Sequence, residues 1–439
     1  MNEINGIRLI SIAHPPGSTR WGDCNCGGDM KRIDALKVLT KHRTDEPIIV
    51  SVGYQPSELN SLGHNDLNLY QVNLPYPSPL GLGLALAIPH QKVIVSDGDG
   101  SAVAGMSTLC TIASAAPPNL IHIVWDNESW MTCGKVRGDH MGPMPTPTAG
   151  RCDFELLAKG AGIEHAYTVR DEREFEDVFV RALRDDKPYV IVAKVDTSTP
   201  AAAPVPYGMT ENAIRFRRAL VDKGWVDPMH AGATTFKDVG FDFGAGDDKG
   251  RVEAVYRDLR EVVPREPGNL SLDHARAIYE GIKAAGIDMF VYLPDSSNYL
   301  IQRFAADDPG MLSVSVTRED EGMAIAMGGF LGGRTSCIVM EASGLGMSYL
   351  ALAWLGIQQR MATLILTSHT DGLGEYTDYH VVTRYLAEPL LRGMGIPHYT
   401  LMDVSEAKRL IKYATMTVRG HVFPVVIQLP RQVLWNDPV

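Results

Sequence analysis

The sequence predicts an α/β protein of two domains, each a parallel sheet covered by helices on both faces. Three observations favour this class: apolar runs rich in Val and Ile recur, helical stretches separate them, and the pattern breaks once, between residues 196 and 269. Continuous apolar strands belong to sheets that are buried on both faces. A length of 439 residues fits two to three domains of about 150 residues each.

The expected strands fall into two groups, one on each side of the break. The first group is Pro47–Val52, Lys92–Val95, Leu120–Trp125 and Tyr189–Lys194, and the second is Met289–Leu293, Leu312–Val316, Ser336–Met340, Ala362–Leu366 and Pro424–Leu429. Helices fit between them. Ser271, for example, can cap a helix that carries Ile278 and Ile282 on one side and ends at Gly286.

Domain limits follow from this pattern. We expect an N-terminal extension over residues 1–29, a first domain over 30–220, a linker over 221–270 and a second domain over 271–439. Within the linker, Asp242, Asp247 and Asp248 lack the spacing and the terminal glutamate of an EF-hand. A solvated linker is therefore expected here rather than a calcium loop.

Composition argues against a nucleic-acid-binding or membrane protein. Lys plus Arg number 41 against 52 for Asp plus Glu, a net charge of −11, whereas a polyanion-binding protein carries a basic stripe. The longest apolar stretch, residues 79–89, is about half the length that crosses a bilayer. The N-terminus lacks the features of a signal peptide, so we expect a cytoplasmic protein.

Cysteine usage agrees with a reducing compartment, because six cysteines in this chain are too few and too scattered for a disulfide framework. Cys24 and Cys26 lie one residue apart, but no second Cys/His pair with zinc-like spacing follows them. A flexible N-terminal extension is the expectation here, rather than a metal or redox site.

Residues 93–127 are the most informative segment. An apolar strand runs into Gly98–Ser101, a helix-like stretch follows, and a second apolar strand ends on Asp126 and Asn127. Polar residues thus lie at the carboxyl ends of two parallel strands, where open sheets bind ligands. The glycines allow close backbone approach, a helix N-terminus favours an anion, and Asp99 with Asn127 offers oxygens to a hard cation. The segment predicts a magnesium diphosphate site, with a surface turn as the plainer alternative.

Gly98-Asp99-Gly100, followed at the right distance by Asn127, resembles the cofactor signature of the thiamine-diphosphate-dependent enzymes. The resemblance implies two domains of the thiamine-diphosphate-binding fold, with Asp99, Asn127 and the carbonyl of Ser129 as Mg²⁺ ligands. Leu80 matches the bulky apolar residue that wedges beneath the cofactor in this family, with a core helix start as the plainer alternative. The expected cofactor-binding residues are Gly98, Asp99, Gly100, Ser101, Asn127, Leu80, Tyr54 and Gln55.

In this family, a glutamate of the second domain hydrogen-bonds the aminopyrimidine of the cofactor and so assists removal of its C2 proton. The strand Leu312–Val316 leads into carboxylates at 319, 320 and 321. Glu321, followed by Gly-Met-Ala, fits the family pattern best and is the predicted catalytic residue, with Glu319 second. A charged helix start is the alternative, because acids favour that end of the helix dipole. Ser343–Gly346 resembles the family's glycine turn beside the pyrimidine.

Domain order narrows the resemblance further, because the diphosphate half precedes the pyrimidine half. About residues 30–219 and 271–435 resemble the beta and alpha parts of sulfopyruvate decarboxylase fused in that order, and are similar to phosphonopyruvate decarboxylase. This resemblance implies non-oxidative decarboxylation of a 2-oxo acid with a second anionic group, giving an aldehyde and CO₂. A carboligase of the acyloin or acetolactate type and a catalytically silent cofactor-binding relative are the alternatives.

The resemblance also implies a homodimer or homotetramer with active sites between chains and a small-molecule substrate, whereas the composition indicates neither nucleic acid nor membrane as a partner. The site for the second anion stays open, because Gly53–Leu59 differs from the relatives' Thr-Ser-Arg-Glu loop and Ser368–Gly372 lacks their Arg-Gly. Ala342 and Met347 likewise replace asparagines. The candidate cations are Lys135, Arg137 and His140, and the candidate acids or bases are His369 and His380, each of which could instead be structural.

Overall fold

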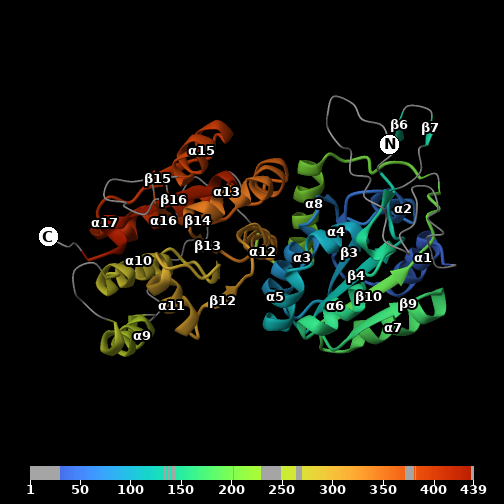
Figure 1. The fold of residues 1–439 in the computed structure, drawn as a ribbon, viewed down its shortest axis with the longest axis horizontal. Helices are drawn as coiled ribbons and strands as arrows, with labels where there is room; N and C mark the ends of the chain where they lie inside the picture. The colour runs from blue at the N-terminus through green and yellow to red at the C-terminus, as the bar shows by residue number, and fades with distance from the viewer. Residues whose placement is uncertain are drawn as a thin grey trace, which may run out of the picture.

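Two parallel six-stranded sheets, both flanked by helices, form the framework of the protein and confirm the predicted fold class (Figure 1). The structure is a computed structural model, and it describes residues 30–132, 135–136, 139–140, 144–200, 202–228, 249–263, 269–370, 380 and 382–436. The N-terminal extension with Cys24 and Cys26, and the aspartates at 242, 247 and 248, lie outside the described residues. None of the described helices is long and apolar enough to cross a membrane.

Every predicted strand is present, and each sheet holds at least one strand that was not expected. The first sheet has the order β2 (Asn68–Val72), β1 (Ile48–Ser51), β3 (Val93–Gly98), β4 (Leu120–Asp126), β10 (Tyr189–Lys194) and β9 (Ala166–Val169). The second has the order β12 (Leu312–Ser315), β11 (Met289–Tyr292), β13 (Ser336–Met340), β14 (Leu364–His369), β16 (Val425–Pro430) and β15 (His398–Thr400). The sequence did not predict β2, β9 or β15.

The two sheets share one topology. In each, the chain adds its second strand on one side of the first and then crosses to the other side to add the third. The connections after the first and third strands therefore leave in opposite directions, which opens a crevice at their carboxyl ends. This places one crevice between β1 and β3 and an equivalent one between β11 and β13.

Both faces of the first sheet are buried because its strands carry apolar side chains on both sides. Ile49, Val93 and Val95 belong to one core, whereas Ile48 and Ile94 belong to the other. The helices of this domain are α1 (Arg32–His42), α2 (Gln55–Ser61), α3 (Pro77–Ala87), α4 (Asp99–Ala104), α5 (Thr108–Ala115), α6 (Phe154–Ala161), α7 (Glu172–Arg184) and α8 (Met209–Asp222). Short pieces follow β4: β5 (Ser129–Trp130), β6 (Lys135–Val136), β7 (Asp139–His140), β8 (Met144–Pro145) and the 3₁₀ turn Pro147–Ala149.

The second domain is built in the same way. Its helices are α10 (Leu272–Ala284), α11 (Tyr299–Asp307), α12 (Glu319–Leu331), α13 (Ala342–Ala351), α14 (Thr383–Leu386), α15 (Glu388–Met394), α16 (Ala407–His421) and α17 (Arg431–Leu434). A π-helical segment Leu352–Gln358 and a 3₁₀ turn Val404–Glu406 complete it. The side chain of Ser271 caps α10 by accepting a hydrogen bond from the His274 N–H, as predicted.

The predicted linker is not uniformly solvated where the structure describes it. Helix α9 (Lys249–Val262) lies within it, packs on α10 and α11, and buries Val252, Val255 and Leu259. These residues recur at the three- to four-residue spacing of an amphipathic helix. The linker prediction missed this pattern because the glycine- and aspartate-rich segment before it dominated the local composition.

Helices α3 and α12 join the two domains and lie between the sheets (Figure 1). One continuous hydrophobic core includes Leu80 and Leu84 of α3 together with Ala324 and Met327 of α12. This contact brings the N-terminal ends of the two helices together, since Tyr76, Pro79 and Glu321 line one small cavity.

Candidate functional site

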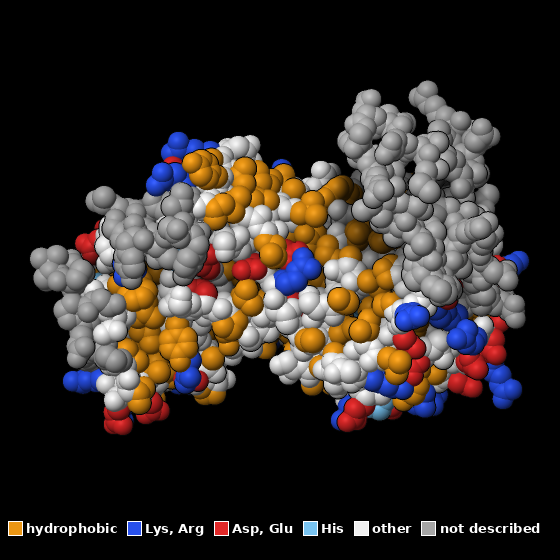
Figure 2. All heavy atoms as spheres, in the orientation of Figure 1, with side chains coloured by type: hydrophobic (Ala, Val, Ile, Leu, Met, Phe, Trp, Pro, Cys, Tyr) orange, Lys and Arg blue, Asp and Glu red, His pale blue; other side chains and the backbone are white. Residues whose placement is uncertain are grey.

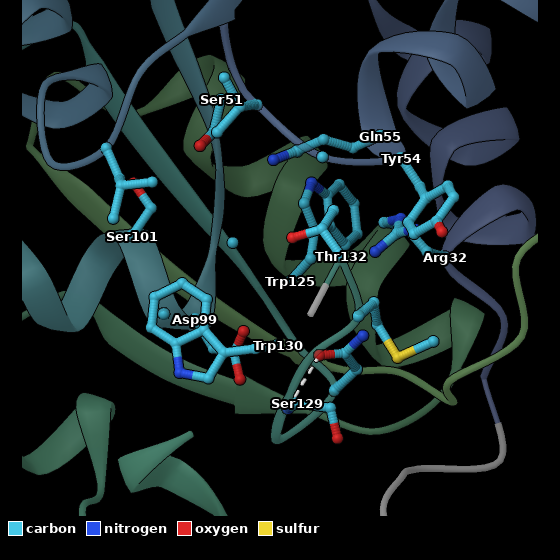
Figure 3. Close-up of a pocket in the computed structure, with 17 residues that line it drawn as sticks. Arg32, Ser51, Tyr54, Gln55, Asp99, Ser101, Trp125, Ser129, Trp130 and Thr132 are labelled. Carbon is cyan, nitrogen blue, oxygen red and sulfur yellow. Dashed lines mark hydrogen bonds between the residues drawn. The ribbon is translucent and has the colours of Figure 1, made fainter. Parts of the chain in front are cut away.

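A pocket of about 190 Å³ lies at the carboxyl ends of β1, β3 and β4, in the crevice predicted by the topology (Figure 3). Three segments supply its walls: the turn from β1 into α2, the turn from β3 into α4, and the residues after β4. The predicted site residues that line it are Tyr54, Gln55, Gly98, Asp99, Gly100, Ser101, Asn127 and Ser129. The structure thus brings eight predicted residues together in one pocket, and their roles there stay predictions.

Asp99 begins α4 and is almost fully buried. Its Oδ2 accepts hydrogen bonds from the hydroxyls of Thr146 at 2.6 Å and Thr148 at 3.1 Å. The pKa of Asp99 is raised to about 6, mainly by burial and also by the nearby Asp126, while these hydrogen bonds partly offset the rise. A bound cation would favour the charged form of this carboxylate.

Asp126 and Asn127 follow β4 and have different surroundings. Asp126 lies 2.7 Å from the Lys194 ammonium and accepts a hydrogen bond from Thr148 at 2.8 Å. The Asn127 Oδ1 accepts a hydrogen bond from the Ser129 N–H at 3.1 Å, which fixes the turn beyond the strand. Asp126 is thus neutralised within the protein, while Asp99 and Asn127 line the pocket.

A chain of hydrogen bonds orients Gln55. The indole N–H of Trp125 donates to the Ser96 hydroxyl at 2.8 Å, and this hydroxyl donates to the Gln55 Oε1 at 2.8 Å. Because the carboxamide oxygen is occupied, the Gln55 NH₂ group is the part of this side chain left to donate to a ligand. Gln55 extends from its helix toward the pocket in Figure 3.

Three serine hydroxyls of the pocket, those of Ser51, Ser101 and Ser129, are buried and have no hydrogen-bond partner among the described residues. A buried hydroxyl without a partner costs free energy, so such groups usually have a functional reason. Gly100 lies against the ring of Trp130, and a side chain at this position would collide with that ring. The pocket therefore presents free donors at a point where the backbone can be approached closely.

Leu74 is among the apolar residues that line this pocket, and Leu80 is not. Leu74 precedes α3 and lines the pocket. Leu80 is the fourth residue of α3, is fully buried in the core, and does not line the pocket. No motif marks Leu74, because it lies in the loop before the glycine-rich helix, and the role of Leu80 stays a prediction.

Glu319 and Glu321 lie in different surroundings at the start of α12. Glu319 packs against Gly344 of the predicted glycine turn. Burial raises the pKa of Glu319, and the neighbouring carboxylates of Asp320, Glu341 and Asp295 add to the rise against a backbone hydrogen bond. Since Asp295 and Glu341 follow β11 and β13, Glu319 faces the crevice of the second sheet.

Glu321 instead faces the junction of the domains. Its Oε2 accepts hydrogen bonds from the Thr317 hydroxyl at 2.6 Å and from the Thr317 N–H at 3.3 Å, while its Oε1 is buried without a partner among the described residues. A glutamate in the first turn that reaches back to a free N–H is a helix-capping arrangement. The structure thus gives Glu321 a capping contact through its Oε2 and leaves its Oε1 without a partner among the described residues.

Comparison with known proteins agrees with this geometry. A family model described as "Thiamine pyrophosphate enzyme, C-terminal TPP binding domain" matches residues 68–193, which include the pocket segments after β3 and β4. Sulfopyruvate decarboxylase subunit alpha of Methanococcus maripaludis is 30% identical over 158 residues, covering 36% of this chain and 95% of that subunit. Subunit beta of Methanocaldococcus jannaschii is 35% identical over 165 residues, covering 37% of this chain and 83% of that subunit. The chain belongs to the sulfopyruvate decarboxylase family of thiamine pyrophosphate enzymes.

Three further proteins are similar to this family member. Phosphonopyruvate decarboxylase of Streptomyces viridochromogenes is 27% identical over 208 residues, covering 46% of this chain and 50% of that protein. Transketolase of Campylobacter jejuni superposes with a TM-score of 0.54 at 14% identity, covering 94% of this chain and 76% of that chain. A putative thiamin diphosphate-dependent enzyme of Mycobacterium smegmatis gives a TM-score of 0.51 at 12% identity, with 92% and 99% coverage. At these identities the two structures establish the fold alone, and they do so over both domains.

The pocket residues of this thiamine pyrophosphate enzyme fit a diphosphate and a divalent metal ion. The unpartnered hydroxyls and the Gln55 amide are donors that phosphate oxygens accept from. Asp99 and Asn127 offer hard oxygen ligands, and the described residues contain no cluster of three or more His, Cys, Asp or Glu that could hold a metal ion by itself. Mg²⁺ is typically held by one or two protein oxygens together with substrate phosphates and water.

The structure describes the candidate histidines and the candidate cations only in part. His369 ends β14 at the same edge of the second sheet as Glu341, whereas the backbone carbonyl of His380 accepts a hydrogen bond from Thr383. Lys135 and His140 pair in the short antiparallel ribbon β6–β7, but their side chains and Arg137 lie outside the described residues. The roles of these residues stay predictions.

Proposed function

We propose that this chain is a thiamine-diphosphate- and Mg²⁺-dependent decarboxylase that converts a 2-oxo acid with a second anionic group into an aldehyde and CO₂. The observation that carries the proposal is the pocket itself, where Asp99 and Asn127 lie beside three buried hydroxyls without partners. The names of the relatives, sulfopyruvate decarboxylase and phosphonopyruvate decarboxylase, support the substrate class.

When bound, thiamine diphosphate supplies a nucleophilic carbon and an electron sink for decarboxylation. The protein's task is to hold this cofactor and control protons around it. We assign Asp99, Asn127 and the Ser129 carbonyl to the metal ion, and Gly98–Ser101 with Tyr54 and Gln55 to the diphosphate. Leu74, which lines the pocket just before α3, is better placed than Leu80 to support the cofactor from below.

For the glutamate that shares a proton with the aminopyrimidine, the geometry favours the second candidate, Glu319. Glu319 faces the crevice of the second sheet and packs on the glycine turn, whereas Glu321 is bonded to Thr317. The raised pKa of Glu319 is also the property required of a carboxyl that keeps a proton near neutral pH. The assignment to Glu321 remains testable by the paired variants described in the Discussion.

The active form is expected to contain at least two copies of the chain. Met347 and Leu350 of α13 are about half exposed, at 51% and 49%, and Tyr385 of α14 is 65% exposed. Figure 2 shows hydrophobic side chains gathered on the upper face of the second domain, where α13 lies in Figure 1. Exposed apolar patches of this kind mark association surfaces, and light scattering of the purified protein would measure the assembly. A cytoplasmic location stays a prediction.

The experiment that tests the function is incubation with thiamine diphosphate, Mg²⁺ and a panel of 2-oxo acids that includes sulfopyruvate and phosphonopyruvate. Released CO₂ and free aldehyde are both quantified. Equal amounts of the two products support the decarboxylase. CO₂ accompanied by an acyloin would identify a carboligase instead, and cofactor binding without CO₂ from any acid would identify a silent relative.

A further inference from the structure

Arg32 is a pocket residue that no motif identified. It is the first residue of α1, lines the pocket, and is buried to 8% exposure. Its Nε and Nη2 donate to the two carboxylate oxygens of Glu58 in α2 at 2.8 and 2.7 Å. This two-point contact with a fully buried glutamate fixes the plane of the guanidinium.

The contact with Glu58 uses only one edge of the guanidinium. A guanidinium carries five N–H donors, so the Nη1 group and one proton of Nη2 remain. Among the described residues no hydrogen bond occupies Nη1 of Arg32. A desolvated, rigidly oriented arginine edge with free donors is the arrangement that binds phosphate or carboxylate in a bidentate manner.

The charges of the pocket are divided between two sides. Of the 17 residues that line it, Arg32 is the only Lys or Arg and Asp99 is the only Asp or Glu. Figure 3 shows Asp99 and Arg32 on opposite sides of the cavity. An anion that reaches a metal ion at Asp99 can thus extend across the pocket toward Arg32.

The position of α1 indicates which part of a bound cofactor meets Arg32. Figure 1 shows α1 on the side of the first domain away from α12 and the second sheet. Arg32 lies across the cavity from the metal-ligand candidate Asp99, so the terminal phosphate, the outermost part of the cofactor, is the part that can reach it. This step rests on the proposed function.

We propose that Arg32, oriented by Glu58, binds the terminal phosphate of the cofactor and makes the pocket selective for a diphosphate over a monophosphate. A bound metal ion and the serine hydroxyls would contact the diphosphate as a whole, whereas only the terminal phosphate would reach the guanidinium. Glu58 acts as a positioning residue, because it contacts Arg32 and does not line the pocket.

The test is equilibrium binding of thiamine diphosphate, thiamine monophosphate and inorganic pyrophosphate to the full chain with Mg²⁺, measured by calorimetry. Trp130, which lies against Gly100, offers a fluorescence signal as a second readout. In Arg32→Gln we expect affinity for thiamine diphosphate and pyrophosphate to fall by about tenfold or more, the loss typical of a charge-assisted hydrogen bond. Affinity for the monophosphate should change by less than about threefold, and Arg32→Lys should be intermediate.

Two results would overturn the proposal: an equal loss for diphosphate and monophosphate, or no loss for either. Because Arg32→Gln leaves Glu58 buried without its partner, the double variant Arg32→Gln/Glu58→Gln removes both charges and serves if the single variant does not fold. Failure of the wild-type chain to bind thiamine diphosphate would contradict the proposed function. If wild type and both Arg32 variants bind thiamine diphosphate equally well, the role proposed for Arg32 is contradicted but the proposed function is not.

Discussion

Gly83 of α3 and Gly328 of α12 bring the two domains into backbone contact. A Cβ on Gly83 would lie 3.0 Å from the Gly328 Cα, and a Cβ on Gly328 would lie 3.0 Å from the Gly83 Cα. A Cβ on either residue would also collide with a backbone carbonyl of the other helix, that of Ile325 or Leu80. The close approach of these helices holds the start of α12, with Glu319 and Glu321, beside the domain that contains the pocket.

The first prediction concerns this contact. Gly328→Ala should lower the free energy of unfolding by about 1–3 kcal/mol, because the added methyl group meets backbone that cannot rotate away. Urea unfolding measures the effect. Gly160→Ala in α6 is the matched control: nothing lies within 4 Å of its added Cβ, so it should be neutral or slightly stabilising. Equal behaviour of the two variants would show that the contact is looser than described.

A second prediction separates the two glutamates. Glu319→Gln should reduce decarboxylation by about 10²–10⁴-fold, the usual contribution of a group that manages a proton in the transition state, while thiamine diphosphate still binds. Glu321→Gln keeps an oxygen that can accept from Thr317, so activity should stay within a few-fold of wild type. Exchange of the cofactor C2 proton, followed by NMR, gives the direct readout. Slow exchange in Glu321→Gln with normal exchange in Glu319→Gln would reverse the assignment.

The third prediction concerns the apolar residue beneath the cofactor. Leu74→Ala should weaken thiamine diphosphate binding or slow turnover with little effect on stability, because Leu74 lines the pocket outside a helix. Leu80→Ala should instead lower the free energy of unfolding by about 2–5 kcal/mol, as expected for a fully buried leucine. Calorimetric titration and thermal unfolding of both variants test the pair. Weaker cofactor binding in Leu80→Ala, with lower stability in Leu74→Ala instead, would support Leu80 as the residue beneath the cofactor.

A fourth prediction is a pH dependence of stability at Asp308. Burial alone would raise the pKa of the Asp308 carboxyl. The Tyr279 hydroxyl donates a hydrogen bond to it at 2.8 Å and the Gly310 N–H at 2.7 Å, and the Lys283 ammonium lies 3.1 Å away. Together these contacts lower the pKa below its ordinary value. A carboxyl whose pKa is lower in the folded state stabilises the fold above its unfolded pKa of about 4. This stabilisation disappears as the pH falls through the folded value.

Asp308→Asn should therefore lower the free energy of unfolding at pH 7 by about 1–3 kcal/mol, and the difference from wild type should shrink below about pH 4. Urea unfolding at pH 7 and pH 3 provides the comparison. A difference of the same size at both pH values would mean that the charge of Asp308 does not contribute.

The strands that the sequence did not predict share a physical feature. β9 and β15 lie at or near a sheet edge and are only partly buried, with Tyr167 and His398 among their half-buried residues. β2 carries Asn68 and Gln71, and Gln71 has a positive φ of 60°. All three are edge strands, and a search for continuous apolar runs overlooks an edge strand that is partly exposed, as β9 and β15 are, or interrupted by polar residues, as β2 is.

The pocket was predictable for a similar reason. Asp99 and Asn127 follow central apolar strands, so their position at one sheet edge follows from the strand assignment. Arg32 could not be found in this way, because its place at the pocket depends on how α1 packs beside α2. The sequence also could not decide between Glu319 and Glu321. Two residues in one helical turn point in different directions, and the sequence does not show which side of the helix faces the crevice.

The central claim is that this pocket holds thiamine diphosphate for the decarboxylation of a 2-oxo acid. Its most direct test is a titration of cofactor-free protein with thiamine diphosphate at fixed Mg²⁺ and saturating sulfopyruvate, recording the rate of CO₂ release. We predict no release without cofactor, a rate that rises with occupancy and saturates, and no rise in Asp99→Ala. Saturable cofactor binding without CO₂ release above the buffer rate, from sulfopyruvate or any other 2-oxo acid, would contradict the claim.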